Sequence, residues 1–401
     1  MSSAGKYSFT KCTVIFSFLC LLAIATTLHF HWASLSSVYL SSIASTQKNH
    51  VVLVPRSANV NQPQIEPPDN EQVHNNVNHM PERVLSATFA DLSAPELNWE
   101  QMPTAPVPRL DGSAVQIKNL LYVFSGYGTL DYVHSHVDIY NFTDNTWSGR
   151  FDTPKEMANS HLGMACDGRY VYIVSGQYGP QCRAPTTRSF VLDTKTRKWK
   201  DFLSLPSPRY AAATQIWKGR LHVMGGSKEN RHTPGTDHWS IAVKNGKALE
   251  NQWRTETPIP RGGPHRACVA VGDRLFVVYG DVYMLDVENK WKVLAPMPKP
   301  DSHIESSWIL HNNSIIIMGG TTEKNPVTKR MILVGEVFQL HLNTLQWSVI
   351  GRLPYRIKTT LAGFWDGYIY FTSGQRDRGP DNPQPRKVVG EMWRTKLSSV
   401  I

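Results

Sequence analysis

The chain is poor in cysteine and lacks the short motifs that mark common enzyme classes. It has five cysteines in 401 residues, and the three outside the N-terminal apolar segment, Cys166, Cys182 and Cys268, fit no zinc-binding spacing. The sequence contains no glycine-rich phosphate loop, no nucleophile elbow and no His-Glu metal helix. We therefore expect no catalytic residue, no metal and no cofactor. The cysteines leave two arrangements open, a Cys166–Cys182 disulfide with one remaining thiol, or three free thiols.

Acidic residues are also in short supply. Lysine and arginine number 42 against 32 for aspartate and glutamate, which gives a formal net charge of +10. Residues 1–40 carry +2 and residues 41–98 carry −3, so residues 99–401 carry +11. A basic folded region favours an anionic partner. Solubility alone is the alternative explanation of the same charge.

Tryptophan, glycine and proline are abundant by contrast, at 12, 27 and 26 residues. This mixture is typical of many short strands joined by turns, and it disfavours long helices. The hydrophobic fraction of 41% is enough for a sizeable core.

The N-terminus contains one apolar run that indicates a membrane anchor. Residues 12–28 are uncharged and the run extends to Trp32, close to the 20 or so residues that a bilayer requires. Lys6 and Lys11 precede the run, and no lysine or arginine follows before Lys48. The positive-inside rule then predicts a cytosolic tail over 1–11, a signal anchor over 12–32, and a lumenal remainder. A cleaved signal peptide is the alternative, because Ala23-Ile24-Ala25 is an acceptable cleavage site.

Residues 33–85 predict a flexible polar stem, since the stretch is rich in Asn, Gln and Pro and poor in aromatic residues. Two glycosylation sequons, beginning at Asn141 and Asn312, fall in predicted turns further along the chain. Tail, anchor, stem and globular region together are the layout of many Golgi-resident proteins. The sequence therefore predicts a single-pass type II membrane glycoprotein of the Golgi or another endomembrane compartment.

The remainder of the chain repeats itself. Tryptophan recurs at positions 99, 147, 199, 253, 291 and 347, and each is followed by a proline-containing turn. Two hydrophobic strands then follow, joined by a two-residue turn such as Lys218-Gly219 or Asp366-Gly367. A loop and a third strand lead to the next tryptophan, which opens a fourth strand. Each repeat thus predicts one four-stranded blade, and such blades must stack around an axis to bury their faces.

The repeat resembles the kelch repeat of the galactose oxidase/kelch superfamily. The glycine pair of that family is present as Gly225-Gly226 and Gly319-Gly320, and in every repeat the second glycine is retained. We expect a side chain there to collide with the neighbouring blade. The resemblance implies an all-β, six-bladed propeller over residues 86–401. The segment 87–102 is expected to supply the strand that completes the last blade, which closes the ring.

The entries to the innermost strands each carry a basic residue or a histidine. Since these entries and the loops after the glycine lie on one face, we expect a basic face that binds an acidic glycan, a phosphate or an acidic peptide. The alternative is that the arginines bond backbone carbonyls and hold the blades together. The candidate ligand-binding residues are Arg109, His161, Arg209, Arg266, His303 and Lys358.

The whole layout resembles the single-pass, membrane-anchored kelch proteins of plants. We therefore interpret the protein as a non-catalytic recognition module facing the secretory lumen, with a protein or an acidic glycan as partner. A copper-radical oxidase of galactose oxidase type is one alternative, with His161, His265, His303, Tyr127, Tyr178 and Cys182 as candidate ligands. A cytosolic kelch adaptor is another, although such adaptors carry an F-box or BTB region before the repeats. The predicted topology excludes a nucleic-acid partner.

Overall fold

The structure is a computed structural model that describes residues 91–129, 131–179, 185–229, 233–325 and 327–397. The predicted tail, anchor and stem, residues 1–85, lie outside this part of the chain. Within it, the regular elements are β-strands. The described residues include no helix of the length and apolarity needed to cross a bilayer.

Three antiparallel sheets form in chain order from the first half of the described residues. The first sheet contains β2 (Ser113–Ile117), β3 (Leu120–Phe124), β6 (His136–Asn141) and β7 (Thr146–Asp152). The second contains β8 (Gly163–Cys166), β9 (Tyr170–Val174), β10 (Ser189–Asp193) and β11 (Lys198–Phe202). The third contains β12 (Ala213–Trp217), β13 (Arg220–Met224), β14 (His238–Lys244), β15 (Lys247–Ala248) and β16 (Arg254–Thr255).

Three further sheets follow, and two smaller ones lie in the connections. The fourth sheet contains β17 (Ala267–Val271), β18 (Arg274–Val278), β19 (Val282–Leu285) and β20 (Trp291–Leu294). The fifth contains β21 (Trp308–His311), β22 (Ser314–Thr321), β23 (Leu333–His341) and β24 (Gln346–Arg352). The sixth contains β26 (Leu361–Trp365), β27 (Tyr368–Thr372), β30 (Met392–Lys396) and β1 (Glu100–Met102). The small sheets pair β4 (Tyr127–Thr129) with β5 (Tyr132–Val133), and β25 (Ile357–Lys358) with β28 (Gln375–Gly379) and β29 (Asn382–Val388).

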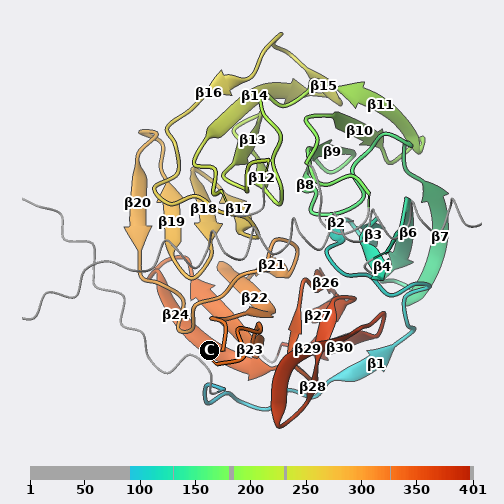
Figure 1. Cartoon of the computed structure of the whole chain (residues 1–401), viewed down its shortest axis with the longest axis vertical. Helices are drawn as coiled ribbons and strands as arrows, with labels where there is room; N and C mark the ends of the chain where they lie inside the picture. Colours follow the sequence, from blue (N-terminus) through green and yellow to red (C-terminus); the bar gives the residue numbers. More distant parts are fainter. Residues whose placement is uncertain (1–90, 130, 180–184, 230–232, 326, 398–401) are drawn as a thin grey trace, which may run out of the picture. The chain divides into compact units, whose positions relative to one another are not determined.

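The two ends of the described chain meet in the sixth sheet. β1 pairs antiparallel with β30, with Gln101 opposite Trp393 (Figure 1). The prediction that the segment before the first repeat completes the last sheet is confirmed. The strand itself is shorter than expected, since residues 91–99 form no strand and reach the fifth and sixth sheets through their side chains and isolated backbone groups instead.

Apolar packing between sheets closes the arrangement. The sheets stand around a common axis with one strand of each innermost (Figure 1), and innermost strands contact one another, as β2 does with both β8 and β26. Six apolar clusters lie between successive sheets, and the last joins Tyr370 of the sixth sheet to Tyr140 of the first. Each buried side chain of this kind contributes about 1.5–3 kcal/mol. No sheet could bury both of its faces alone, so the stability lies between the sheets.

The repeated tryptophans mark the same contacts. The indole Nε1 of Trp147 donates to Pro103 O at 2.9 Å, and that of Trp199 donates to Asp152 O at 3.1 Å. Trp253, Trp291 and Trp347 donate in the same way to carbonyls four or five residues after the preceding tryptophan. Trp99 donates to Arg352 O at 2.8 Å, which joins the start of the repeats to their end. Each repeated tryptophan therefore ties its own sheet to a neighbouring one.

The hairpin turns and the repeated glycine follow from backbone conformation. Both residues of the turn Lys218-Gly219 have positive φ, 50° and 73°, as a tight two-residue hairpin requires. Gly226 has φ 70°, and a Cβ there would lie 2.8 Å from Tyr210 O. Tyr210 belongs to the entry of the same sheet, so the expected collision with a neighbouring blade was wrong. The glycine lets the end of the second strand pass the entry loop of its own sheet.

Candidate functional site

Three of the predicted ligand-binding residues are buried arginines. The Arg109 side chain donates to Ser125 O and to the carboxylate of Asp138. Arg209 donates to Pro208 O at 2.7 Å and to the carboxylate of Asp237. Both residues are at most 2% exposed. Each positive charge is neutralised by a carboxylate within the protein. Neither guanidinium is therefore available to a ligand at the surface.

Arg266 differs in having no carboxylate partner among the residues that the structure describes. Its Nη2 donates to Gly262 O at 2.7 Å, and its guanidinium carbon lies 4.6 Å from the centroid of the Tyr279 ring. Burial lowers the pKa of Arg266 from its ordinary value. The three arginines therefore bond carbonyls and hold the entry loops, which is the alternative that the sequence left open. Whether any of the six predicted residues also binds a ligand stays a prediction.

A ring of six residues, one from the entry of each sheet, surrounds the axis. Asp111 and Ala211, which lie two positions after Arg109 and Arg209, belong to it. One residue from the entry of each sheet has positive φ at this level, between 47° and 62°. Backbone N–H groups of the ring donate to the preceding member, as in His161 N to Asp111 O and His265 N to Ala211 O, each at 3.1 Å. The ring consists of Asp111, His161, Ala211, His265, His303 and Thr359. Two of the predicted residues, His161 and His303, thus occupy equivalent places in it.

Aromatic rings fill the middle of this ring of residues. The His265 and His303 imidazoles are stacked with centroids 3.9 Å apart and planes 15° apart. His161 stacks on Tyr210 at 4.2 Å, and the Tyr210 hydroxyl bonds His265 Nε2 at 2.9 Å. These contacts tie four sheets together at the axis. We refer to the ring residues with Tyr210 and Glu305 as the axial cluster.

Two carboxylates accompany the imidazoles. Asp111 lies 3.2 Å from His161 Nε2, and Glu305 lies 3.0 Å from His265 Nδ1. Burial raises the pKa of Asp111, but the charge of His161 and the hydrogen bond from it outweigh this effect and hold the pKa well below its usual range. Burial also lowers the pKa of His161. His161 Nε2 faces the Asp111 carboxylate, and its Nδ1 lies 3.0 Å from Ser160 Oγ.

Lys358 adds a cation beside the axial cluster. It is the second residue of β25, is 7% exposed, and its Nζ lies 3.6 Å from Met331 Sδ. Its charge lowers the pKa of Asp111 further. Burial is the main cause that holds the pKa of His303 well below its ordinary value, and the charges of His265 and Lys358 add to it. The structure therefore brings His161, His303 and Lys358 together, and leaves the three arginines in separate places.

Sequence reasoning missed Asp111 and Glu305 as members of the axial cluster. Asp111 and His161 stand two residues after positions 109 and 159, so alignment of the repeats on the proline turns would have shown the equivalence. Glu305 has no such signal, because it reaches His265 through a turn peculiar to the fifth repeat.

A copper centre does not fit these side chains. Both ring nitrogens of His161 and of His265 already have protein partners, and the stacked rings of His265 and His303 do not converge on one point. Among the described residues no group of three or more His, Cys, Asp or Glu is placed to hold a metal. Tyr178 is 50% exposed, and Cys182 lies outside the described part of the chain.

A cavity of about 410 Å³ occupies the channel between the innermost strands. It begins next to the axial cluster at Glu305 and continues past Gln116 and Gln215. Cys166 and Cys268 also line it. Both are free thiols, whereas Cys182, the other partner of the suggested disulfide, lies outside the described residues. Burial raises the pKa of both thiols, which keeps them protonated and unreactive.

Exposed positive charge is concentrated elsewhere, on two loops that touch. The connection between β22 and β23, residues 323–325 and 327–330, meets the β28–β29 hairpin, residues 376–387. Gln384 accepts from Arg330 at 3.3 Å and donates to Thr328 Oγ1 at 3.3 Å. We refer to these segments as the basic loop pair. Their exposed cations are Lys324, Lys329, Arg330, Arg378, Arg386 and Lys387.

Few acidic groups oppose these cations. Among the described residues of the loop pair, Asp381 is the exposed acid and Glu323 is half-buried, whereas Asp377 is buried and bonded to Arg356. Val327, 85% exposed, adds an apolar side chain next to the cations. The basic loop pair thus forms a positively charged surface that includes one exposed apolar side chain, Val327. It lies on the same face of the propeller as the entry loops.

Two of the comparisons with known proteins name the kelch repeat. The model of the KLHDC2/KLHL20/DRC7 kelch-repeats domain matches residues 154–320. A kelch repeat-containing protein of Arabidopsis thaliana is 62% identical over 391 residues, covering 89% of this chain and 90% of that protein. The N-acetylneuraminate epimerase of Pasteurella multocida is 21% identical over 331 residues, covering 70% and 78%. The solved structure of YjhT aligns with a TM-score of 0.60 at 15% identity, covering 75% of this chain and 98% of that one.

Proposed function

Because the chain belongs to the kelch repeat-containing proteins, we propose that it is a six-bladed recognition propeller that binds an acidic protein or glycan. The six tryptophan bonds and the six apolar clusters support this blade count. The observation that carries the binding proposal is the basic loop pair, whose exposed cations outnumber its exposed acids. Such a surface attracts an anionic partner and accelerates its encounter.

The six predicted ligand-binding residues take a more limited part in this proposal. Arg109, Arg209 and Arg266 fix the entry loops through carbonyl and carboxylate bonds, and His161 and Lys358 are buried at the axis. His303 is the half-buried member of the six, so it is the one open to direct contact with a partner. We propose that the partner rests on the loop pair and reaches toward His303.

An experiment with matched charge changes tests the binding proposal. The triple variant Lys324→Glu/Arg378→Glu/Arg386→Glu reverses three cations of the basic loop pair. We expect its retention on an immobilised sulfated glycan or a polyglutamate peptide to fall by about tenfold in affinity, with the wild-type interaction weakening steeply as salt rises.

The control reverses three cations elsewhere. Lys195, Lys198 and Lys200 are exposed around the outer strand of the second sheet, and the variant with glutamate at all three has the same net charge as the loop variant. Wild-type-like retention of this control, with loss in the loop variant, supports the proposal. Equal losses in both would mean that net charge, and not the loop pair, governs binding.

We further propose that the propeller faces the secretory lumen on a type II anchor, in the Golgi or a neighbouring compartment. The apolar run over 12–32 and the lysines before it support this topology. The sequons are accessible to different degrees: Asn312 is exposed in the β21–β22 turn, whereas the Asn141 side chain bonds Asp144 and Asn119. Glycosidase treatment should increase the mobility of wild type, and Asn312→Asp should remove most of that increase. An unchanged mobility of wild type would favour the cytosolic adaptor alternative.

A further inference from the structure

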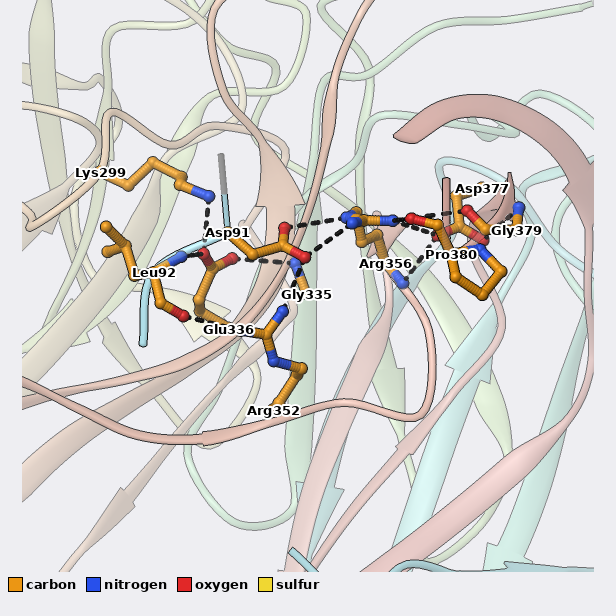
Figure 2. Close-up of polar contacts among 10 residues, drawn as sticks. All are labelled: Asp91, Leu92, Lys299, Gly335, Glu336, Arg352, Arg356, Asp377, Gly379 and Pro380. Carbon is orange, nitrogen blue, oxygen red and sulfur yellow. Dashed lines mark hydrogen bonds and ion pairs between the residues drawn. The ribbon is translucent and has the colours of Figure 1, made fainter. Parts of the chain in front are cut away.

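The carboxylate of Asp91 is held between two arginines of the propeller (Figure 2). Arg356 binds it with two groups, Nε to Oδ1 at 2.9 Å and Nη2 to Oδ2 at 2.6 Å. Arg352 adds a bond from Nη1 to Oδ2 at 2.7 Å. Paired N–H donors of this geometry select a planar carboxylate.

The next residue is recognised through its backbone. Leu92 N donates to Glu336 Oε1 at 2.7 Å, and Leu92 O accepts from Arg352 Nη2 at 2.7 Å. Its side chain packs on the apolar cluster between the fourth and fifth sheets. Glu336 is fully buried and paired with Lys299 at 2.6 Å, so its carboxylate is fixed in place. The propeller therefore contacts four groups within two residues: the acidic side chain of Asp91, and the amide, the carbonyl and the apolar side chain of Leu92.

Two of the three receiving groups, Arg356 and Glu336, are held by contacts other than those with Asp91 and Leu92. Arg356 Nη1 also donates to Asp377 at 3.2 Å and to Pro380 O at 3.0 Å (Figure 2). Glu336 keeps its bonds from Lys299 and from Gly335 N. If Asp91 left, these side chains would stay oriented toward the vacated place. The site is therefore preorganised for another occupant, which lowers the entropic cost of binding.

The site also extends beyond the two residues that fill it. A pocket of about 290 Å³ continues from Asp91 toward Tyr355 and Arg376. The Arg376 guanidinium carbon lies 3.9 Å from the centroid of the Tyr355 ring, and its ion pair to Glu391 is long, at 3.7 Å. A second acidic group of a bound peptide would meet this cation.

Closure of the ring does not depend on Asp91 and Leu92. The strand pairing of β1 with β30, the Trp99 indole bond and the bond from Thr395 Oγ1 to Asn98 O already attach the segment downstream of them. Asp91-Leu92 is thus extensively bonded to the propeller although it lies outside the closing strand. It resembles a peptide ligand that is part of the same chain.

We propose that Arg352, Arg356 and Glu336, with the adjoining pocket, form a binding site for a peptide containing an acidic residue followed by an apolar one. Asp91-Leu92 occupies this site in cis, and a partner peptide binds by displacing it. The site adjoins the basic loop pair, because Arg376, Asp377 and Pro380 of the β28–β29 hairpin line its pocket. The groups that bind Asp91-Leu92, namely Arg352, Arg356 and Glu336, lie outside the pair. The site gives the protein a second mode of protein recognition, one that its own N-terminal segment regulates.

The test uses the full-length chain and a fluorescent peptide of residues 87–95, ATFADLSAP. The variant Asp91→Ala/Leu92→Ala should bind this peptide at least tenfold more tightly than wild type, because a tethered segment competes at an effective concentration of the order of millimolar. Adding Arg356→Ala to that variant should abolish binding, as should replacing the peptide aspartate by asparagine. If the double variant is poorly folded, Asp91→Asn provides the same comparison with a smaller gain.

The proposal is overturned if the folded double variant binds no peptide, or if binding survives Arg356→Ala or the asparagine peptide. Its failure is distinguishable from failure of the basic loop pair. Arg356→Ala should leave retention on the sulfated glycan near wild type, whereas the loop-pair variant should retain most of its peptide binding in the Asp91→Ala/Leu92→Ala background.

Discussion

The entries of the innermost strands and the basic loop pair use the same side chain in opposite ways. At the entries, Arg109 and Arg209 are buried, and each has a carboxylate partner. On the loop pair, Arg378 and Arg386 are exposed beside few acids. The first set recurs with the repeat and the second does not. In this protein a repeated cation serves the fold, whereas a cation outside the repeat pattern is available to a partner.

Removal of a repeated arginine should have the largest effect. In Arg109→Ala the Asp138 carboxylate, 2% exposed, loses its buried partner and keeps only Arg150 and His136 nearby. Breaking a buried ion pair from one side costs about 3–5 kcal/mol. We expect that loss in the free energy of unfolding, measured with denaturant. The exposed Arg378→Ala should change the same quantity by less than about 0.5 kcal/mol. Similar losses in both would erase the distinction between the two regions.

A buried histidine pair sharpens the comparison through pH. His222 Nδ1 and His238 Nε2 are 2.8 Å apart in the third sheet, and His238 Nδ1 bonds Thr257 O. Burial lowers the pKa of His222 to about 3 and that of His238 to about 4. The unfolded chain binds protons with a pKa near 6.5, so stability is present above that pH and is lost as the pH falls.

At pH 5 we expect each of these histidines to lower the free energy of unfolding by about 2 kcal/mol relative to pH 8. In His222→Gln the amide can still donate to His238, and the decline below pH 6.5 should become shallower. At pH 8 the histidines are neutral in both the folded and the unfolded chain. The difference in free energy of unfolding between wild type and His222→Gln at that pH therefore reports the altered packing alone. An unchanged slope in the variant would contradict the buried, neutral state of His222.

The smallest effect concerns the closing contact. Trp99→Phe removes the indole bond that joins the two ends of the repeats, and Trp199→Phe removes its equivalent between the first and second sheets. One net hydrogen bond of this kind contributes about 1 kcal/mol. If the two ends of the chain are held as firmly as neighbouring sheets elsewhere in the ring, both variants should lose the same free energy of unfolding. Thermal or denaturant unfolding measures this loss. A negligible loss in Trp99→Phe alone would indicate a loosely held closing strand.

Much of the fold was predictable because it depends on residues that repeat. The tryptophans, the second glycine and the two-residue turns gave the four-stranded unit, and the tryptophan at 99 indicated the closing segment. The contact made by the second glycine was assigned to the wrong blade, since spacing alone does not show which backbone a Cβ would meet. The short length of β1 was missed for a related reason, because residues 91–99 reach the sheets without pairing as a strand.

The site was less predictable because burial and pairing arise only in three dimensions. The sequence marked Arg109 and Arg209 as basic, but their partners Asp138 and Asp237 lie 28 or 29 residues further on and share no motif with them. His161 and His303 were found through the repeat, whereas Glu305 was not. Asp91 lies in a segment that the sequence predicted only as the closing strand. Nothing in the sequence therefore indicated that two arginines bind its carboxylate.

Retention on the sulfated glycan, compared between Arg209→Gln and the loop-pair variant Lys324→Glu/Arg378→Glu/Arg386→Glu, tests the central claim most directly. Both are compared as folded proteins at one salt concentration. The account predicts near wild-type retention for Arg209→Gln, despite its lower stability, and about a tenfold loss for the loop-pair variant. Loss of retention in Arg209→Gln with binding intact in the loop-pair variant would show that the repeated arginines, and not the exposed loops, bind the partner.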